Sequence, residues 1–253
     1  MSLATDSAAL WLRRFSSTPA PRLRLICFAH AGGGPSAYRT WHERLPTWAE
    51  VVAVRYPGRQ DRLLEPCIDR MEPLADAVAH AVRPLLDRPV VLFGHSMGAW
   101  VGYEVARRLR ARWGMEPAAL VMSGQVPPGR RSVRSVSGDE DLIAEVRRLG
   151  GADESMFDEP ELLELVLPPI RADFALIDAY RPEPAEPFSC PLLVCSGAQD
   201  ADVPPEAAAA WAATTTGPFR RREFPGGHFY LTDDEPALLG ELGEWLASVT
   251  TRR

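Results

Sequence analysis

A chain of 253 residues is long enough for one large α/β domain, since folds of this class often reach roughly 250 residues as a single unit. Apolar residues make up 46 % of the chain, which excludes an intrinsically disordered protein, and the net charge of −6 gives no indication of a nucleic-acid partner. No apolar run approaches the roughly 18 residues of a membrane span, and Arg13 and Arg14 precede polar residues rather than the apolar core of a secretory signal, so we expect a soluble, cytoplasmic protein.

Short apolar runs predict the strands of a sheet. In chain order these runs are 23–29, 51–56, 89–93, 118–122, 191–196 and 219–224. Helical patterns separate most of them, which is typical of βαβ units and hence of parallel strands. An amphipathic helix is expected over 235–249. We therefore predict a single α/β domain over 1–253, with a mostly parallel central sheet flanked by helices.

Residues 124–188 interrupt this alternation. They begin with a basic, turn-rich stretch and continue with helical patterns over 139–149, 159–167 and 170–180, and no strand is predicted among them. An insertion of helices between two strands is well placed to act as a lid. The apolar residues expected to roof a chamber beneath it are Leu163, Leu167, Phe174 and Ile177.

A G-x-S-x-G pattern lies within V-V-L-F-G-H-S-M-G-A, between an apolar strand and a helical pattern over 99–112. This strand–turn–helix context is the one in which an α/β-hydrolase presents its nucleophile, so we predict that Ser96 is the nucleophile and that the chain has this fold. Gly94 and Gly98 are expected because side chains there would collide with neighbouring backbone. The N-terminus of the following helix favours developing negative charge.

A serine nucleophile needs a base and an acid, which follow it in the order Asp then His in this fold. His228 lies in a glycine-rich loop between the last predicted strand and the last helix, whereas His42 and His80 lie in helical patterns. The segment G-A-Q-D-A-D-V follows a predicted strand and offers Asp200 and Asp202, of which the spacing favours Asp200. The acid would orient the imidazole of His228 and stabilise its charged form.

Two backbone N–H groups are needed to bind the oxyanion that forms during acyl transfer. We predict that Met97, directly after the nucleophile, supplies one of them. The other is expected from Ala31, in the loop F-A-H-A-G-G-G after the first clear strand. A phosphate-binding loop is an alternative interpretation of these glycines, but the segment lacks both G-x-G-x-x-G and a Lys-Ser or Lys-Thr ending.

Taken together, these motifs closely resemble those of type II thioesterases, the stand-alone editing hydrolases of polyketide and nonribosomal peptide assembly lines. The matching segments are WLRRF (11–15), CFAHAGGG (27–34), YPGRQDR (56–62), LFGHSMGAWVGYEVAR (92–107), LPPIRADFALIDAY (167–180), GAQDADV (197–203) and GGHFYL (226–231). Two departures are small: Ala29 stands where the family usually has proline, and Trp100 is bulkier than the usual residue.

The resemblance implies a serine thioesterase that removes aberrant or stalled short acyl groups from the phosphopantetheine arms of acyl or peptidyl carrier domains. It implies no bound metal or cofactor, since the pantetheine belongs to the substrate, and none of the four cysteines forms a C-x-x-C pair. The carrier domain is the expected partner, and no nucleic acid or membrane is. The basic run of Arg130, Arg131 and Arg134 is a candidate contact for an acidic carrier surface. We expect a monomer.

Three alternatives remain at this point. The chain could be another serine hydrolase, such as an esterase or a terminal thioesterase. It could be an acyltransferase, since those enzymes also carry G-H-S-x-G, although they work without an aspartate-backed histidine late in the chain. It could also be a carrier-binding module without activity, which a complete Ser–Asp–His set disfavours.

Overall fold

Seven strands form one mixed sheet in a computed structural model that describes residues 8–130, 136, 138–151, 157 and 159–251. The strands lie in the order β1-β3-β2-β4-β5-β6-β7, and every neighbouring pair is parallel except β1 with β3. Their bounds are β1 Leu12–Arg14, β2 Leu23–Phe28, β3 Ala49–Val54, β4 Val90–His95, β5 Ala119–Ser123, β6 Leu192–Gly197 and β7 Phe219–Phe224. The predicted mostly parallel sheet is confirmed.

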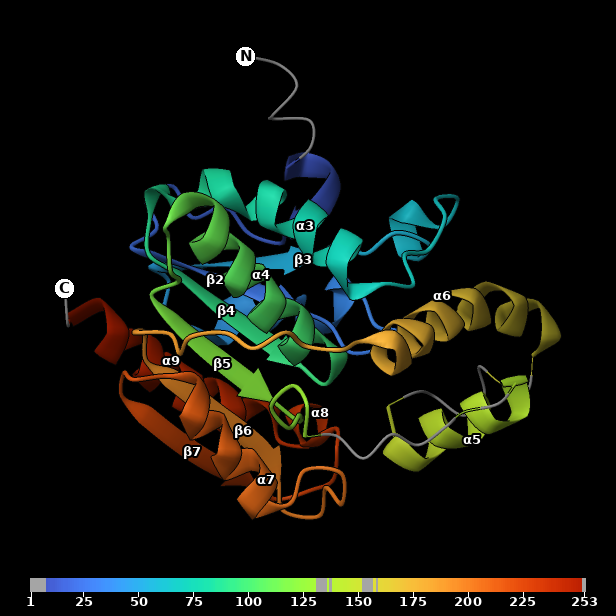
Figure 1. The fold of residues 1–253 in the computed structure, drawn as a ribbon. Coiled ribbons are helices and arrows are strands. Elements are labelled where there is room, and N and C mark those ends of the chain that lie inside the picture. The colour runs from blue at the N-terminus through green and yellow to red at the C-terminus, as the bar shows by residue number, and fades with distance from the viewer. Residues whose placement is uncertain (1–7, 131–135, 137, 152–156, 158, 252–253) are drawn as a thin grey trace.

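Helices cover both faces of this sheet (Figure 1). On one face α3 (Met71–Val82) packs against α4 (Met97–Trp113), and on the other α9 (Glu235–Thr251) lies beside the short α2 (Trp41–Arg44). The central strands are therefore buried on both sides, which is why their sequences are nearly continuous apolar runs. The shorter elements are α7 Pro205–Ala209 and α8 Tyr230–Asp233, with 3₁₀ turns at Pro35–Tyr38, Gln60–Arg62, Arg83–Asp87 and Ala210–Thr214.

Two elements differ from the sequence prediction. Strand β1 was not predicted; it pairs antiparallel with the edge of the sheet, with Leu12 opposite Val54. The helical patterns over 159–167 and 170–180 form one continuous helix, α6 (Pro160–Ala179), with Pro168 and Pro169 inside it. A proline inside a helix removes a hydrogen bond and disfavours the preceding turn. Tertiary packing of the flanking apolar residues evidently outweighs that cost here.

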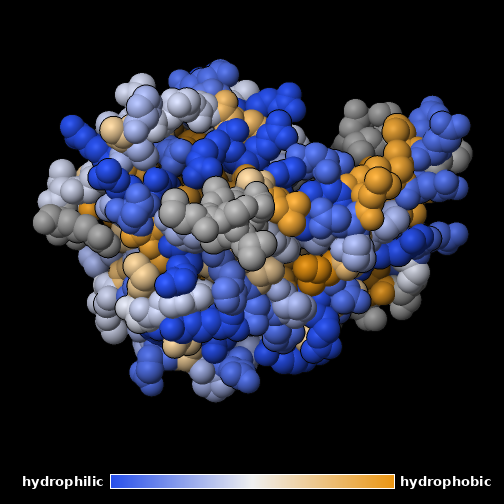
Figure 2. Space-filling model, turned by 90° about the horizontal axis from the view of Figure 1, so that it is seen from above, coloured by the Kyte–Doolittle hydropathy of each residue, from blue (hydrophilic) through white to orange (hydrophobic). Residues whose placement is uncertain are grey.

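The segment 124–188, which we call the helical insertion, carries α5 (Gly138–Leu149) and α6 between β5 and β6. The two helices lie side by side beyond the ends of the strands (Figure 1). They have a small hydrophobic cluster of their own, separate from the main core and made of Leu142, Phe157, Leu167, Ile170 and Phe174. The outer surface of α6 exposes Leu162 and Leu165, and apolar atoms are visible on this part of the molecule in Figure 2. The C-terminal end of α6 belongs instead to the main core, through Leu176, Ile177 and Tyr180.

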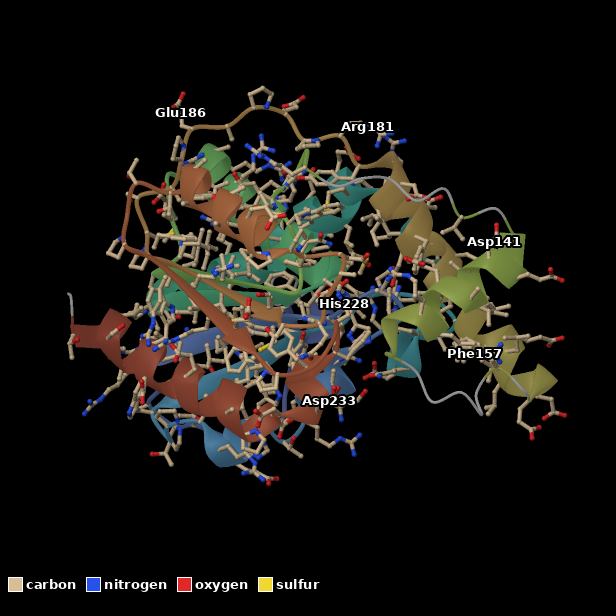
Figure 3. The ribbon with its side chains drawn as sticks, turned by 90° about the horizontal axis from the view of Figure 1, so that it is seen from below. Asp141, Phe157, Arg181, Glu186, His228 and Asp233 are labelled. Atoms are coloured by element: carbon tan, nitrogen blue, oxygen red, sulfur yellow. The ribbon has the colours of Figure 1, made fainter. Side chains whose placement is uncertain are left out.

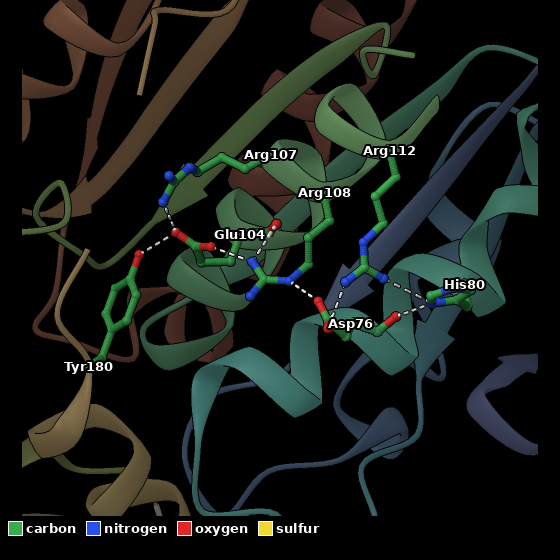
Figure 4. Close-up of polar contacts among 7 residues, drawn as sticks. All are labelled: Asp76, His80, Glu104, Arg107, Arg108, Arg112 and Tyr180. Carbon is green, nitrogen blue, oxygen red and sulfur yellow. Dashed lines mark hydrogen bonds and ion pairs between the residues drawn. The ribbon is translucent and has the colours of Figure 1, made fainter. Parts of the chain in front are cut away.

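A buried carboxylate links the C-terminal end of α6 to α4. Glu104 accepts a hydrogen bond of 2.7 Å from the hydroxyl of Tyr180 and one of 2.6 Å from Arg107, and it also pairs with Arg108 (Figure 4). Arg108 in turn donates to Asp76 of α3. A buried carboxylate is costly unless it is paired in this way. The network therefore holds one end of the helical insertion against the helices that flank the sheet.

Candidate active site

Ser96 lies in a strained turn between β4 and α4. Its backbone has φ 55° and ψ −122°, a region that residues other than glycine rarely adopt, and its N–H donates to the carbonyl of Ser123 at 2.8 Å. A Cβ atom on Gly94 would lie 2.1 Å from the carbonyl oxygen of Gly98, and one on Gly98 would lie 2.1 Å from that of Phe28. The steric reason predicted for both glycines is confirmed.

Hydrogen bonds join Ser96, His228 and Asp200 in a continuous chain. The Nε2 atom of His228 lies 2.9 Å from the Oγ of Ser96, and its Nδ1 lies 2.8 Å from the Oδ2 of Asp200. Asp200 follows β6 and His228 follows β7, so neighbouring parallel strands bring both loops to the same edge of the sheet. His228 lies where that edge faces the helical insertion (Figure 3). Because an ionised carboxylate can only accept, Nδ1 carries the proton and Nε2 is free to accept one from Ser96.

Asp202, the alternative acid, contacts a different group. Its carboxylate pairs with Arg148 of α5, while its backbone N–H donates to the Oδ1 of Asp200 at 3.0 Å. Asp200, rather than Asp202, therefore contacts His228. The two acidic residues are connected, since the backbone N–H of Asp202 binds Oδ1 of Asp200 while Oδ2 of Asp200 contacts His228.

Two further histidines, His30 and His95, lie near His228. His95 is fully buried, and its Nδ1 lies 2.9 Å from the Oγ of Ser123, which contacts the hydroxyl of Tyr230 at 2.6 Å. His30 lies edge-on to Phe229, with ring centroids 4.8 Å apart. Burial, with a smaller effect of His228, lowers the pKa of His30 to about 4 and the pKa of His95 well below its ordinary value. Both rings are thus neutral at neutral pH and add no positive charge beside His228.

The lowered pKa of His30 predicts that the folded protein loses stability in acid. Between about pH 6.5 and 4 the unfolded chain binds a proton at this histidine and the folded chain does not, so acid favours unfolding. The free energy of unfolding should fall by up to about 1.4 kcal/mol per pH unit for this group. Urea unfolding of the wild type and of His30→Gln between pH 7 and 4 measures the difference. The variant should show the shallower dependence; equal slopes would contradict the prediction.

The predicted oxyanion donors border Ser96. Met97 is the first residue of α4, where a backbone N–H has no partner within the helix. Ala31, in the loop after β2, lines the same cavities as Ser96 and His228. That these two N–H groups bind an oxyanion stays a prediction.

Two cavities meet at Ser96, and both are bordered by Ala31, Leu149, Phe174 and His228. The first encloses about 350 Å³ between the glycine-rich loop and apolar side chains of the helical insertion and its neighbourhood, namely Val146, Leu149, Phe157, Val166, Ile170, Phe174 and Phe229. The second encloses about 300 Å³ and has a more polar lining that includes Gln125, Arg130, Glu145 and Asp202. A substrate bound at Ser96 therefore has two differently lined cavities available to it.

The prediction of which apolar residues roof the chamber beneath the insertion is only partly correct. Phe174 lines both cavities and Ile177 lines the second. Leu163 and Leu167 line neither cavity, although they belong to or pack on the same cluster as Phe174. Trp100 also lies outside both linings; its Nε1 donates to the carbonyl of Val126 at 2.8 Å and so supports a loop of the second cavity.

The thioesterase domain family matches residues 23–246 of the chain. The chain belongs to this family. It is 41 % identical over 248 residues to the probable cadicidin biosynthesis thioesterase of Streptomyces griseus, covering 97 % of this chain and 68 % of that protein. The α/β-hydrolase fold and the predicted thioester hydrolase activity are thereby confirmed.

Solved structures of thioesterases have the same fold. RedJ, a thioesterase from the prodiginine biosynthetic pathway in Streptomyces coelicolor, superposes with a TM-score of 0.85 at 41 % identity, over 90 % of this chain and 92 % of RedJ. The type II thioesterase BorB from the borrelidin biosynthetic cluster gives 0.85 at 37 % identity, over 93 % of this chain and 97 % of BorB. The predicted resemblance to type II thioesterases is confirmed. In the parts of the chain that the structure describes, no helix has the length and apolar character required to cross a membrane.

Proposed function

We propose that this thioesterase hydrolyses acyl groups from phosphopantetheine thioesters on acyl or peptidyl carrier domains, with Ser96, His228 and Asp200 as the catalytic triad. The observation that carries the proposal is the unbroken hydrogen-bonded chain of these three residues at the meeting point of two cavities. The test is incubation of an acyl-carrier thioester with the protein and with Ser96→Ala. Free acid from the wild type alone supports it; transfer of the acyl group to a second carrier would indicate an acyltransferase.

The proposed reaction has two halves. Ser96 Oγ attacks the thioester carbonyl while His228 Nε2 takes its proton, and Asp200 stabilises the resulting imidazolium. The oxyanion is bound by the N–H groups of Met97 and Ala31. The C–S bond then breaks and the carrier thiol leaves with the proton from His228. Water attacks the acyl-serine in the same way, releasing the free acid and restoring Ser96. No step requires a metal or a bound cofactor.

We assign the acyl group to the first, apolar cavity and the pantetheine arm to the second. The apolar side chains contributed by the helical insertion suit an alkyl group, which supports a lid function for this segment. The polar side chains of the second cavity suit the amide groups of the arm, and Arg130 lies at its edge. Arg131 and Arg134 of the basic run lie outside the described residues. A carrier domain docked beside Arg130 is the proposed partner.

The small first cavity predicts a preference for short acyl groups, as an enzyme that clears stalled units requires. On one carrier, kcat/KM should be highest for acetyl, propionyl or butyryl and should vary by about 10- to 200-fold at most per methylene. A long chain should react slowly because it must displace the helical insertion. Malonyl should react slowly because burial of its carboxylate without a partner is costly. If malonyl or the long chain were the best substrate, the editing role would be wrong, although hydrolysis through Ser96 would stand.

A further inference from the structure

A buried ion pair joins the helical insertion to the loop that borders Ser96. Arg59 follows β3, and Asp173 lies in α6, 114 residues further along the chain. Two parallel hydrogen bonds connect them, one of which joins Nη2 of Arg59 to Oδ1 of Asp173 at 2.8 Å. The side chains are only 6 % and 2 % exposed. The sequence prediction assigned neither residue a role.

The same carboxylate also holds the glycine-rich loop. Oδ2 of Asp173 accepts a hydrogen bond of 2.7 Å from the N–H of Gly32, and Arg59 donates to the carbonyl of Gly33 at 3.3 Å. Gly32 has a φ of +76°, and a Cβ atom there would lie 2.8 Å from the side chain of Ile170. The loop therefore rests directly on α6, and its backbone polar groups are bonded to the ion pair.

This contact fixes the backbone next to a predicted oxyanion donor. The peptide group between Ala31 and Gly32 carries the N–H that Asp173 binds, so its plane is set by the carboxylate. The N–H of Ala31 belongs to the preceding peptide group, which is joined to this one through the Cα of Ala31, so the contact restrains the position of that N–H relative to Ser96 from one side. Preorganised donors of this kind contribute about 10²–10³ in kcat, and a displacement of about 1 Å is enough to lose much of that.

A contribution to folding stability does not by itself explain why an ion pair is buried between α6 and the glycine-rich loop. Replacing such a pair by apolar residues of similar volume is often neutral or stabilising, because the charges no longer have to be desolvated. An apolar residue at position 173, however, could not accept the N–H of Gly32. The carboxylate supplies that acceptor, and the guanidinium of Arg59 supplies the charge that allows the carboxylate to be buried.

We propose that the Arg59–Asp173 pair is a positioning element that aligns the oxyanion loop and does so only when α6 is seated against the loop. The proposal rests on the proposed function of Ser96 and Ala31. Seating of the helical insertion and completion of the oxyanion site are then one event. If α6 moves away, the N–H of Gly32 loses its acceptor and the loop loses its fixed geometry.

A pair of double variants tests the acceptor directly. Arg59→Met/Asp173→Leu removes both charges and the acceptor, whereas Arg59→Met/Asp173→Asn keeps an oxygen that can bind Gly32 in a side chain of similar shape. On p-nitrophenyl butyrate, the leucine variant should lose about 100-fold in kcat with little change in KM. The asparagine variant should recover about tenfold of that loss. Affinity for a trifluoromethyl ketone, whose adduct with Ser96 needs the oxyanion site, should fall in parallel with kcat.

The matched control is Arg171→Gln/Asp139→Asn, which removes an exposed ion pair between α5 and α6 and should leave kcat unchanged. Equal kcat in the leucine and asparagine variants, with wild-type affinity for the ketone, would overturn the proposal. Should both double variants fail to fold, Asp173→Glu moves the acceptor by one methylene and keeps the charge. It should also lower kcat, and an unchanged kcat would overturn the proposal.

Cleavage of p-nitrophenyl butyrate distinguishes a failure of this proposal from a failure of the proposed function. It needs Ser96 and the oxyanion site but no carrier domain. If the wild type cleaves the ester and not the acyl-carrier thioester, the carrier substrate is wrong and the positioning result stands. If the wild type cleaves neither, both proposals fail.

Discussion

Replacing Asp200 with asparagine is expected to lower kcat for acyl-carrier hydrolysis by about 10⁴-fold. The asparagine amide can donate a hydrogen bond to Nδ1 of His228, which favours the tautomer with its proton on Nε2. That proton would then face the Oγ of Ser96, 2.9 Å away, and leave the serine without a base. Steady-state kinetics on one acyl-carrier substrate measure the loss, and KM should change little because the carboxylate contacts no part of the substrate in the proposed mechanism.

Asp202→Asn is the matched control. It removes a partly exposed pair with Arg148, an interaction worth about 1 kcal/mol or less, and keeps the backbone N–H that holds Asp200. We expect kcat within about threefold of the wild type, since the contacts among Ser96, His228 and Asp200 are unchanged, and any effect should fall on KM, because Asp202 lines the second cavity. A larger loss from Asp202→Asn than from Asp200→Asn would contradict the assignment of the acid.

Gly98→Ala is expected to be among the most damaging small substitutions in the described part of the chain. The new Cβ would lie 2.1 Å from the carbonyl oxygen of Phe28, which is backbone and cannot rotate away. Either β2 or the start of α4 must move, so the free energy of unfolding should fall by more than about 4 kcal/mol or the chain should not fold. In any folded fraction, movement of α4 displaces Ser96 and Met97, and kcat should fall by at least about 100-fold.

Gly240→Ala in α9 provides the comparison, because nothing lies within 4 Å of the added Cβ. Alanine is a better helix former than glycine, so this variant should gain about 0.5–1 kcal/mol and keep wild-type kcat. Urea unfolding and the rate of ester cleavage measure both variants. Wild-type stability and activity in Gly98→Ala would show that the turn relaxes freely, contrary to the steric argument.

Local pattern explains why most of the fold could be predicted. The five central strands are buried on both faces, so each is a distinct apolar run that lies within two residues of its predicted position. The edge strand β1 has only three residues, of which Arg13 and Arg14 face solvent, and so it carries no such signal. In α6 the local signal was misleading: Pro168 and Pro169 predicted a break that packing on the insertion's cluster overrides.

The residues of the site also differ in whether a local sequence motif predicts them. Ser96, Asp200 and His228 each follow a predicted strand and carry a distinctive local motif, so the topology that assembles them could be predicted with them. The Arg59–Asp173 pair has no local motif, because its partners are brought together only by the fold. One sign was available in the sequence: Asp173 is an acidic residue within the apolar stretch A-D-F-A-L-I, where a buried carboxylate would need a cation. Sequence alone could not name Arg59 as that cation.

The separate cluster of the helical insertion has a consequence for how this enzyme can diverge. The outer wall of the first cavity includes Val146 and Val166, which pack on that cluster and not on the core of the sheet. In the proposed binding mode, substitutions there would alter the volume available to an acyl group, while neither residue takes part in the hydrogen bonds among Ser96, His228 and Asp200. At these two positions the size of the first cavity can therefore change without altering the contacts that join Ser96, His228 and Asp200.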